Sequence, residues 1–200
     1  DYVPEGKRNC IFGFMVAPPG LGIETAKKEV MNVMDQRLAP YIDGEKIGII
    51  GGSYGGFMTM RAMTHTPEEF VVGVNLFGVT NWLRTLKNIP TWWESFKEAL
   101  YLEMGDPNTA DSTRLYDISP VFHGDKVKNP VMVLQGATDP RVLQVESDEM
   151  VAAIKKNNIP VEYVLFEDEG HGFVKKENQI IGYGKALIFL DKYLKNKVKG

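Results

Sequence analysis

The sequence has almost no cysteine, no long apolar run and no excess of one charge. Cys10 is the only cysteine in the 200 residues, so no disulfide can form within the chain, and we interpret it as a small apolar filler. No stretch approaches the roughly 18–20 apolar residues of a membrane span. The 23 Lys and Arg face 26 Asp and Glu, which predicts neither a nucleic-acid partner nor an anionic membrane surface as partner.

Other absences leave questions open. A cysteine-poor chain suits the cytosol as well as the periplasm, so the compartment stays undecided. No Cys/His cluster has the spacing of metal ligands and there is no phosphate-binding loop, so we expect no metal and no cofactor. The chain starts at Asp1, without a methionine or a signal-peptide pattern. The chain therefore looks like a fragment. Its length suits one domain, at most two, and we expect a single domain over residues 1–200.

Short apolar runs alternate with amphipathic stretches along the chain. The runs are rich in Val, Ile and Phe and are bounded by Gly, Pro or Asp, as in strands buried within a sheet. The alternation predicts an α/β fold, a mostly parallel sheet with helices on both faces. The expected strands are Cys10–Ala17, Ile47–Ile50, Phe70–Phe77, Val131–Leu134 and Val161–Phe166. The expected helices are Ile23–Leu38, Tyr54–Thr64, Glu146–Asn157 and Gln179–Lys197.

Residues 78–130 interrupt this alternation. The segment is rich in Trp, Tyr, Phe and Pro, and it is too long for a plain loop. We expect short helices there that form a lid or a pocket wall over a site.

A glycine-rich turn joins the second expected strand to its helix. Residues 51–55 read Gly-Gly-Ser-Tyr-Gly, the G-x-S-x-G pattern of a nucleophile elbow, in the strand–turn–helix context that the elbow requires. Glycine at Gly51 and Gly55 avoids collisions in so tight a turn. Ser53 is then the candidate nucleophile, and the backbone N–H of Tyr54 is the candidate oxyanion donor.

Of the three histidines, His171 suits the general base best. In this fold the catalytic acid and then the histidine follow the serine along the chain. His171 follows the last expected strand, between two glycines that allow a loop to bring the ring over Ser53. We expect a surface role for His65 and a structural role for His123.

Asp139 is the candidate acid that orients His171. It follows the expected strand Val131–Leu134, and an open α/β sheet places its ligand-facing residues at the carboxyl ends of its strands. An Asp-Pro turn is the simpler alternative. Asp168 and Glu169 we expect to be solvent-facing or to support the histidine indirectly. Together the three motifs predict a serine hydrolase that acts through an acyl-enzyme.

At these motifs the sequence resembles the prolyl oligopeptidase family of serine peptidases, in the branch of the dipeptidyl-peptidases and acylaminoacyl-peptidases. The resemblance rests on residues 51–56 (Gly-Gly-Ser-Tyr-Gly-Gly), 135–142 (Gln-Gly-Ala-Thr-Asp-Pro-Arg-Val) and 168–173 (Asp-Glu-Gly-His-Gly-Phe). It implies an α/β-hydrolase fold that lacks its first strands, and peptide substrates cleaved near a hydrophobic or proline-like residue.

The resemblance also implies a substrate pocket lined by Tyr54, Val79 and Trp82. Packing within the lid is the alternative for these side chains. Arg141 matches the acid loop of the family, and we weigh substrate contact equally against an ion pair with Glu146.

Two features of the family are not visible in the sequence. The β-propeller domain that filters substrates is absent, and so is the loop whose tyrosine gives the second oxyanion donor. Gly20, after Pro18 and Pro19, is a weak replacement because prolines donate no N–H. Two alternatives to a peptidase therefore stay open: an esterase for small acyl esters, and a poorly active fragment.

A shortened sheet would expose a strand edge, which favours pairing with a second copy. We therefore predict a homodimer. Light scattering that detects only monomer at tens of micromolar would contradict it.

Overall fold

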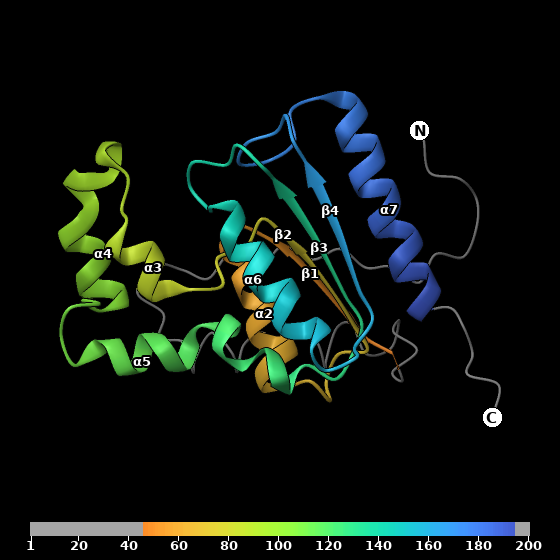
Figure 1. The fold of residues 1–200 in the computed structure, drawn as a ribbon, viewed down its shortest axis with the longest axis horizontal. Coiled ribbons are helices and arrows are strands. Elements are labelled where there is room, and N and C mark those ends of the chain that lie inside the picture. Colours follow the sequence, from red (N-terminus) through yellow and green to blue (C-terminus); the bar gives the residue numbers. More distant parts are fainter. Residues whose placement is uncertain (1–45, 195–200) are drawn as a thin grey trace, which may run out of the picture. The chain divides into compact units, whose positions relative to one another are not determined.

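The computed structural model describes residues 46–194. Its strands form one parallel sheet in the order β1-β2-β3-β4, which is also their order in the chain (Figure 1). All four carboxyl ends therefore lie at the same edge of the sheet. The strands are β1 (Gly48–Gly52), β2 (Val72–Leu76), β3 (Val131–Gly136) and β4 (Val161–Phe166).

Helices cover both faces of this sheet (Figure 1). On one face lie α2 (Tyr54–His65) and α6 (Gln144–Lys155), whose methionines and isoleucine pack on Val131 and Val133 of β3. On the other face lies α7 (Lys176–Leu194), which packs on the alternate side chains of β2, β3 and β4. Side chains that alternate between two apolar layers explain why the strands read as continuous apolar runs.

Short helices occupy most of the segment between β2 and β3. They are α3 (Trp82–Lys87), η3 (Thr91–Phe96), α4 (Lys97–Met104), α5 (Asp111–Ile118) and η4 (Pro120–Lys126). A separate core lies under this segment, where Phe57 and Val142 pack on Val79, Trp82, Leu86 and Leu115. It anchors the segment to the start of α2 and to the loop that precedes α6.

The α/β prediction is confirmed, with small shifts at element ends. The apolar run Phe70–Phe77 forms a strand only over Val72–Leu76, and the last helix starts at Lys176, three residues before the expected Gln179. The expected strand Cys10–Ala17 and helix Ile23–Leu38 lie outside the described residues, and the predicted domain of residues 1–200 extends beyond them. No helix within residues 46–194 has the length and apolar character to cross a membrane.

Candidate active site

Ser53 occupies the single-residue turn between β1 and α2. Its φ of 54° and ψ of −117° lie outside the regions that non-glycine residues commonly adopt. Backbone hydrogen bonds hold the turn on both sides: Ser53 N donates to Leu76 O (2.9 Å), and Phe57 N donates to Ser53 O (3.0 Å). Such backbone strain persists only where the surrounding structure imposes it.

Two glycines allow this turn to close. A side chain at Gly51 would overlap the carbonyl of Gly55, and a side chain at Gly56 would overlap Asn75 and the backbone of Gly78. The expected crowding at Gly55 is not found among residues 46–194, where nothing lies within 4 Å of a Cβ placed at that position. The crowded position is one residue later, where α2 passes the end of β2.

The structure brings Ser53, His171 and Asp139 together from three loops. His171 Nε2 lies 2.9 Å from Ser53 Oγ, and His171 Nδ1 lies 2.8 Å from Asp139 Oδ2. The second carboxylate oxygen of Asp139 accepts hydrogen bonds from the backbone N–H groups of Arg141 (2.8 Å) and Val142 (2.9 Å). The Asp139 side chain is completely buried, so these bonds fix the direction in which its free oxygen points.

The loop that carries His171 is held by a buried carboxylate. Glu169 is only 1% exposed, and its two oxygens accept hydrogen bonds from Val174 N (3.0 Å), Lys175 N (2.9 Å) and Asn178 Nδ2 (2.8 Å). Burial opposes ionisation, but these donors outweigh it and lower the pKa of Glu169 below its ordinary value. A solvent-facing Glu169 is thus ruled out, whereas Asp168 is half exposed and pairs with Lys175.

Close backbone packing brings the same loop toward β3. A side chain at Gly136 would overlap the carbonyls of Glu169 and Gly170, and Thr138 Oγ1 donates to Glu169 O (2.7 Å). The ring of Phe77 packs against the imidazole of His171 with 5.0 Å between centroids.

A cavity of about 370 Å³ opens beside Ser53 and His171. Its lining includes all four residues expected for the substrate pocket: Tyr54, Val79, Trp82 and Arg141. Tyr54 and Trp82 approach each other with ring centroids 5.9 Å apart. The rest of the wall comes from residues 84–104 and from the 140–146 loop and helix start, namely Arg84, Thr85, Leu86, Asn88, Ile89, Pro90, Trp93, Leu100, Glu103, Met104, Pro140, Val142, Leu143 and Glu146.

Burial and charge modify two of the ionisable groups in this lining. Burial raises the pKa of the Tyr54 hydroxyl, and the nearby charge of Glu103 raises it further. Burial also raises the pKa of Glu146, although Thr80, Arg84 and Asn81 act against it.

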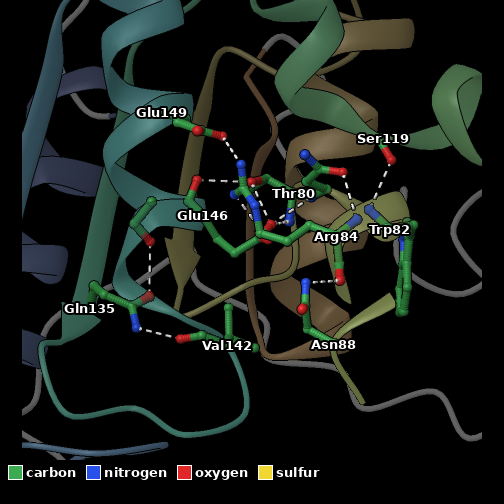
Figure 2. A network of polar contacts seen from close by, with 11 residues as sticks. Thr80, Trp82, Arg84, Asn88, Ser119, Gln135, Val142, Glu146 and Glu149 are labelled. Carbon is green, nitrogen blue, oxygen red and sulfur yellow. Dashed lines mark hydrogen bonds and ion pairs between the residues drawn. The ribbon is translucent and has the colours of Figure 1, made fainter. Parts of the chain in front are cut away.

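Glu146 pairs with Arg84 rather than with Arg141. The distance from Arg84 Nη1 to Glu146 Oε1 is 3.3 Å, and Arg84 Nη2 lies 2.6 Å from Glu149 Oε2 (Figure 2). The expected alternative of an Arg141–Glu146 pair is therefore wrong. Arg141 is exposed at the cavity, and its backbone N–H binds Asp139.

Sequence reasoning missed Arg84, Glu103 and Glu146 as cavity residues. One signal for Glu146 was present: it is four residues before Met150 and eight before Ile154, on the side of the helix that faces the core. A carboxylate among apolar residues at that spacing indicates a buried polar group with partners.

The backbone N–H of Tyr54 lies in the first turn of α2, where N–H groups have no acceptor within the helix. Among residues 46–194 this N–H has no acceptor, so it can donate to an oxygen bound beside Ser53. Gly20, offered above as a second donor, lies outside the described residues.

The other two histidines lie together, away from this site. His65 and His123 stack edge to face with 4.9 Å between ring centroids. His65 is half-buried rather than on the surface, and hydrogen-bonds to Thr64 Oγ1 (2.8 Å) and to Arg61. Within the described part of the chain, no three His, Cys, Asp or Glu side chains form a cluster that could hold a metal ion.

A parallel sheet covered by helices, with a serine in the strained turn after β1, places the protein in the α/β-hydrolase class. The chain belongs to the prolyl oligopeptidase family, whose sequence pattern matches residues 28–197.

The relatives are peptidases by name. The chain is 47% identical over 135 residues to dipeptidyl aminopeptidase BIII of Pseudoxanthomonas mexicana, which covers 67% of this chain and 20% of that protein. It is 41% identical over 151 residues to dipeptidyl peptidase family member 6 of Caenorhabditis elegans. That match covers 74% of this chain and 20% of the relative. This chain thus spans about a fifth of the length of these curated relatives.

Solved structures agree on the fold. A puromycin-hydrolyzing peptidase of Mycobacterium tuberculosis superposes with a TM-score of 0.73 at 28% identity, over 88% of this chain and 26% of that one. The uncomplexed acylaminoacyl peptidase of Pyrococcus horikoshii superposes with a TM-score of 0.73 at 25% identity. The match covers 86% of this chain and 28% of that one.

Proposed function

We propose that this chain carries the catalytic centre of a serine peptidase, with Ser53 as nucleophile, His171 as general base and Asp139 as the acid that orients the base. The observation that carries the proposal is the continuous line of contacts from Ser53 Oγ through the imidazole to Asp139, at 2.9 Å and 2.8 Å. Membership of the prolyl oligopeptidase family supports peptides as the substrate class.

The reaction follows from these positions. Ser53 Oγ attacks the carbonyl carbon of the scissile amide while His171 Nε2 takes the hydroxyl proton. Asp139 holds Nδ1 protonated and stabilises the imidazolium that forms. The backbone N–H of Tyr54 donates to the oxyanion. The amide C–N bond then breaks, the amine leaves with the proton from His171, and a water molecule hydrolyses the acyl-enzyme by the same proton transfers.

The cavity beside Ser53 suits the side chain of the residue whose carbonyl is attacked. Tyr54, Val79 and Trp82 give it an apolar, partly aromatic wall, which favours a hydrophobic or proline-like residue. Arg141 is exposed at the same cavity and offers a cationic donor for a substrate carbonyl.

A fluorophosphonate probe tests the proposal directly, because it reacts only with an activated serine. We expect covalent labelling of the chain and none of Ser53→Ala. An aminoacyl arylamide and a short-chain aryl ester are then compared as substrates. Hydrolysis of the ester alone would replace the peptidase proposal with an esterase, and an unlabelled wild-type chain would indicate a fragment without catalytic activity.

A further inference from the structure

A single buried carboxylate organises one wall of the cavity. Glu146 lies in the first turn of α6, and only 1% of it is exposed. Its Oε2 atom accepts hydrogen bonds from the backbone N–H groups of Thr80 (2.9 Å) and Asn81 (2.6 Å) and lies 3.0 Å from Thr80 Oγ1 (Figure 2). Its Oε1 atom faces Arg84 at 3.3 Å. Helix α6 is thereby joined to the turn between β2 and α3.

The turn that Glu146 holds carries two side chains of the cavity. Thr80 and Asn81 stand between Val79 and Trp82, which are both buried and both line the cavity. The side chain of Asn81 in turn caps α3 by accepting from Arg84 N (3.1 Å). The orientation of two wall residues and the start of a helix therefore depend on two consecutive N–H groups that share one carboxylate oxygen.

Beyond this turn, Trp82 has one further polar anchor, the hydrogen bond from its backbone N–H to Ser119 Oγ (2.9 Å). The indole Nε1–H of Trp82 is buried without a hydrogen-bond partner among the described residues. Among the described residues, no hydrogen bond of its own therefore orients the ring, and a small displacement of the turn would change the shape of the wall.

We propose that Glu146 is a positioning residue for the substrate pocket: it fixes Val79 and Trp82 in place by holding the backbone of Thr80 and Asn81. The inference rests on the proposed function for the identity of the pocket, and it adds a residue outside the Ser53–His171–Asp139 set. Glutamine at this position would keep the shape but would place an NH₂ group against N–H or guanidinium donors, because an amide has only one acceptor oxygen.

Glu149 provides a matched control. It binds the same Arg84 at 2.6 Å from the same helix, but its side chain is 44% exposed, and within residues 46–194 it forms no hydrogen bond with the turn of Thr80 and Asn81. Glu149→Gln removes one charge from α6 and one partner from Arg84, so it separates the loss of charge from the loss of the turn's acceptor.

The kinetic test compares two N-blocked p-nitroanilides, one of glycine and one of phenylalanine, which leave the pocket empty or fill it. For Glu146→Gln we expect KM for the phenylalanine compound to rise about tenfold, the effect of losing one polar contact to a charged group. The glycine compound and fluorophosphonate labelling of Ser53 should stay within about twofold of wild type, and Glu149→Gln should match wild type throughout. Equal losses for both substrates, or no change for either, would overturn the proposal.

A second measurement does not depend on turnover. The indole N–H resonance of Trp82, assigned by its absence in Trp82→Phe, should shift in Glu146→Gln and stay unchanged in Glu149→Gln. If the wild-type chain neither labels nor hydrolyses, the proposed function fails while this resonance still tests the wall. If Glu146→Gln does not fold, Thr80→Val removes one hydroxyl contact to the same oxygen and should give a smaller shift. An unmoved resonance in the folded variant would show that packing alone sets the wall.

Discussion

At the scale of single residues, the chemistry depends on a backbone conformation that serine does not prefer. Ser53 adopts a φ of 54° because β2 and α2 both hydrogen-bond to it and because the flanking backbone packs without side chains. The glycines around Ser53 therefore differ in how strictly the structure requires them to lack a side chain. Gly51 and Gly56 face crowded backbone, whereas Gly55 faces open space among the described residues.

The three glycines should respond differently to replacement by alanine. We expect Gly51→Ala and Gly56→Ala to lose fluorophosphonate labelling and to lower Tm, because each new Cβ would overlap backbone atoms. Gly55→Ala should label like wild type and gain up to about 1 kcal/mol of stability, because alanine favours a helix over glycine. Labelling rates and thermal unfolding measure both effects. Equal damage from all three substitutions would contradict the assignment.

A second residue-scale prediction concerns the histidine loop. Glu169→Gln should lower kcat and Tm, because its carboxylate binds the backbone of Val174 and Lys175 and thereby holds the segment that follows His171. Asp168→Asn is the control, since Asp168 is half exposed and its ion pair with Lys175 lies at the surface. Steady-state kinetics and thermal unfolding should separate the two variants. Indistinguishable variants would show that the loop is held by its backbone packing alone.

The sign of the pH effect at Glu169 follows from the direction of its shift. Its pKa is lower in the folded chain than in the unfolded chain, so its contribution to stability is present above the ordinary pKa of a glutamate and is lost as the pH falls through the folded value.

At the scale of elements, the last residue of α2, His65, lies where its protonated form is disfavoured. Burial, followed by the charges of Arg61 and the nearby His123, lowers the pKa of His65 from 6.5 to about 4. The helix dipole would stabilise a cation in the last turn. Here desolvation and the charge of Arg61 outweigh that effect on the pKa of His65.

This arrangement predicts an acid-sensitive helix end. As the pH falls from 6.5 to about 4, the unfolded chain takes up the proton on His65 before the folded chain does, so the free energy of unfolding decreases across that window. His65→Gln should flatten this part of the profile of unfolding free energy against pH. Urea unfolding at several pH values measures it. A variant with the wild-type slope would place the acid sensitivity in other groups.

At the scale of the whole described chain, stability depends on two apolar layers on opposite faces of one sheet. Val72, Val74, Met132 and Leu134 point to α7, and Val131 and Val133 point to α2 and α6. Because the loops at one edge of this sheet carry Ser53, Asp139 and His171, losing either layer should disturb the site together with the fold.

Helix α7 offers a matched pair of substitutions. Phe189 is 2% exposed in the layer against β2 and β3, whereas the neighbouring Ile188 is 71% exposed. Phe189→Ala should cost roughly 3–5 kcal/mol of unfolding free energy, while Ile188→Ala should stay within about 0.5 kcal/mol. Urea denaturation measures the difference. A large loss at Ile188 would show that a surface outside residues 46–194 covers this face.

Much of the fold and of the candidate site follows from the sequence by itself. Alternating apolar runs and helical periods gave the parallel α/β sheet, because a strand buried on both faces must be apolar throughout. Chain order and strand ends selected Ser53, Asp139 and His171, because the carboxyl ends of parallel strands meet at one edge of a sheet.

The tertiary structure decided the contacts that cross between elements. Gly56 rather than Gly55 is crowded because the end of β2 passes beside α2. Arg84 rather than Arg141 pairs with Glu146 because Glu146 also binds the turn of Thr80 and Asn81, directly before α3. Glu169 is buried because the chain folds back on it through Val174 and Lys175. A carboxylate, an arginine or a glycine looks alike in any sequence. Its role depends on which donors and which backbone atoms the fold brings to it, and those come from positions far away in the chain.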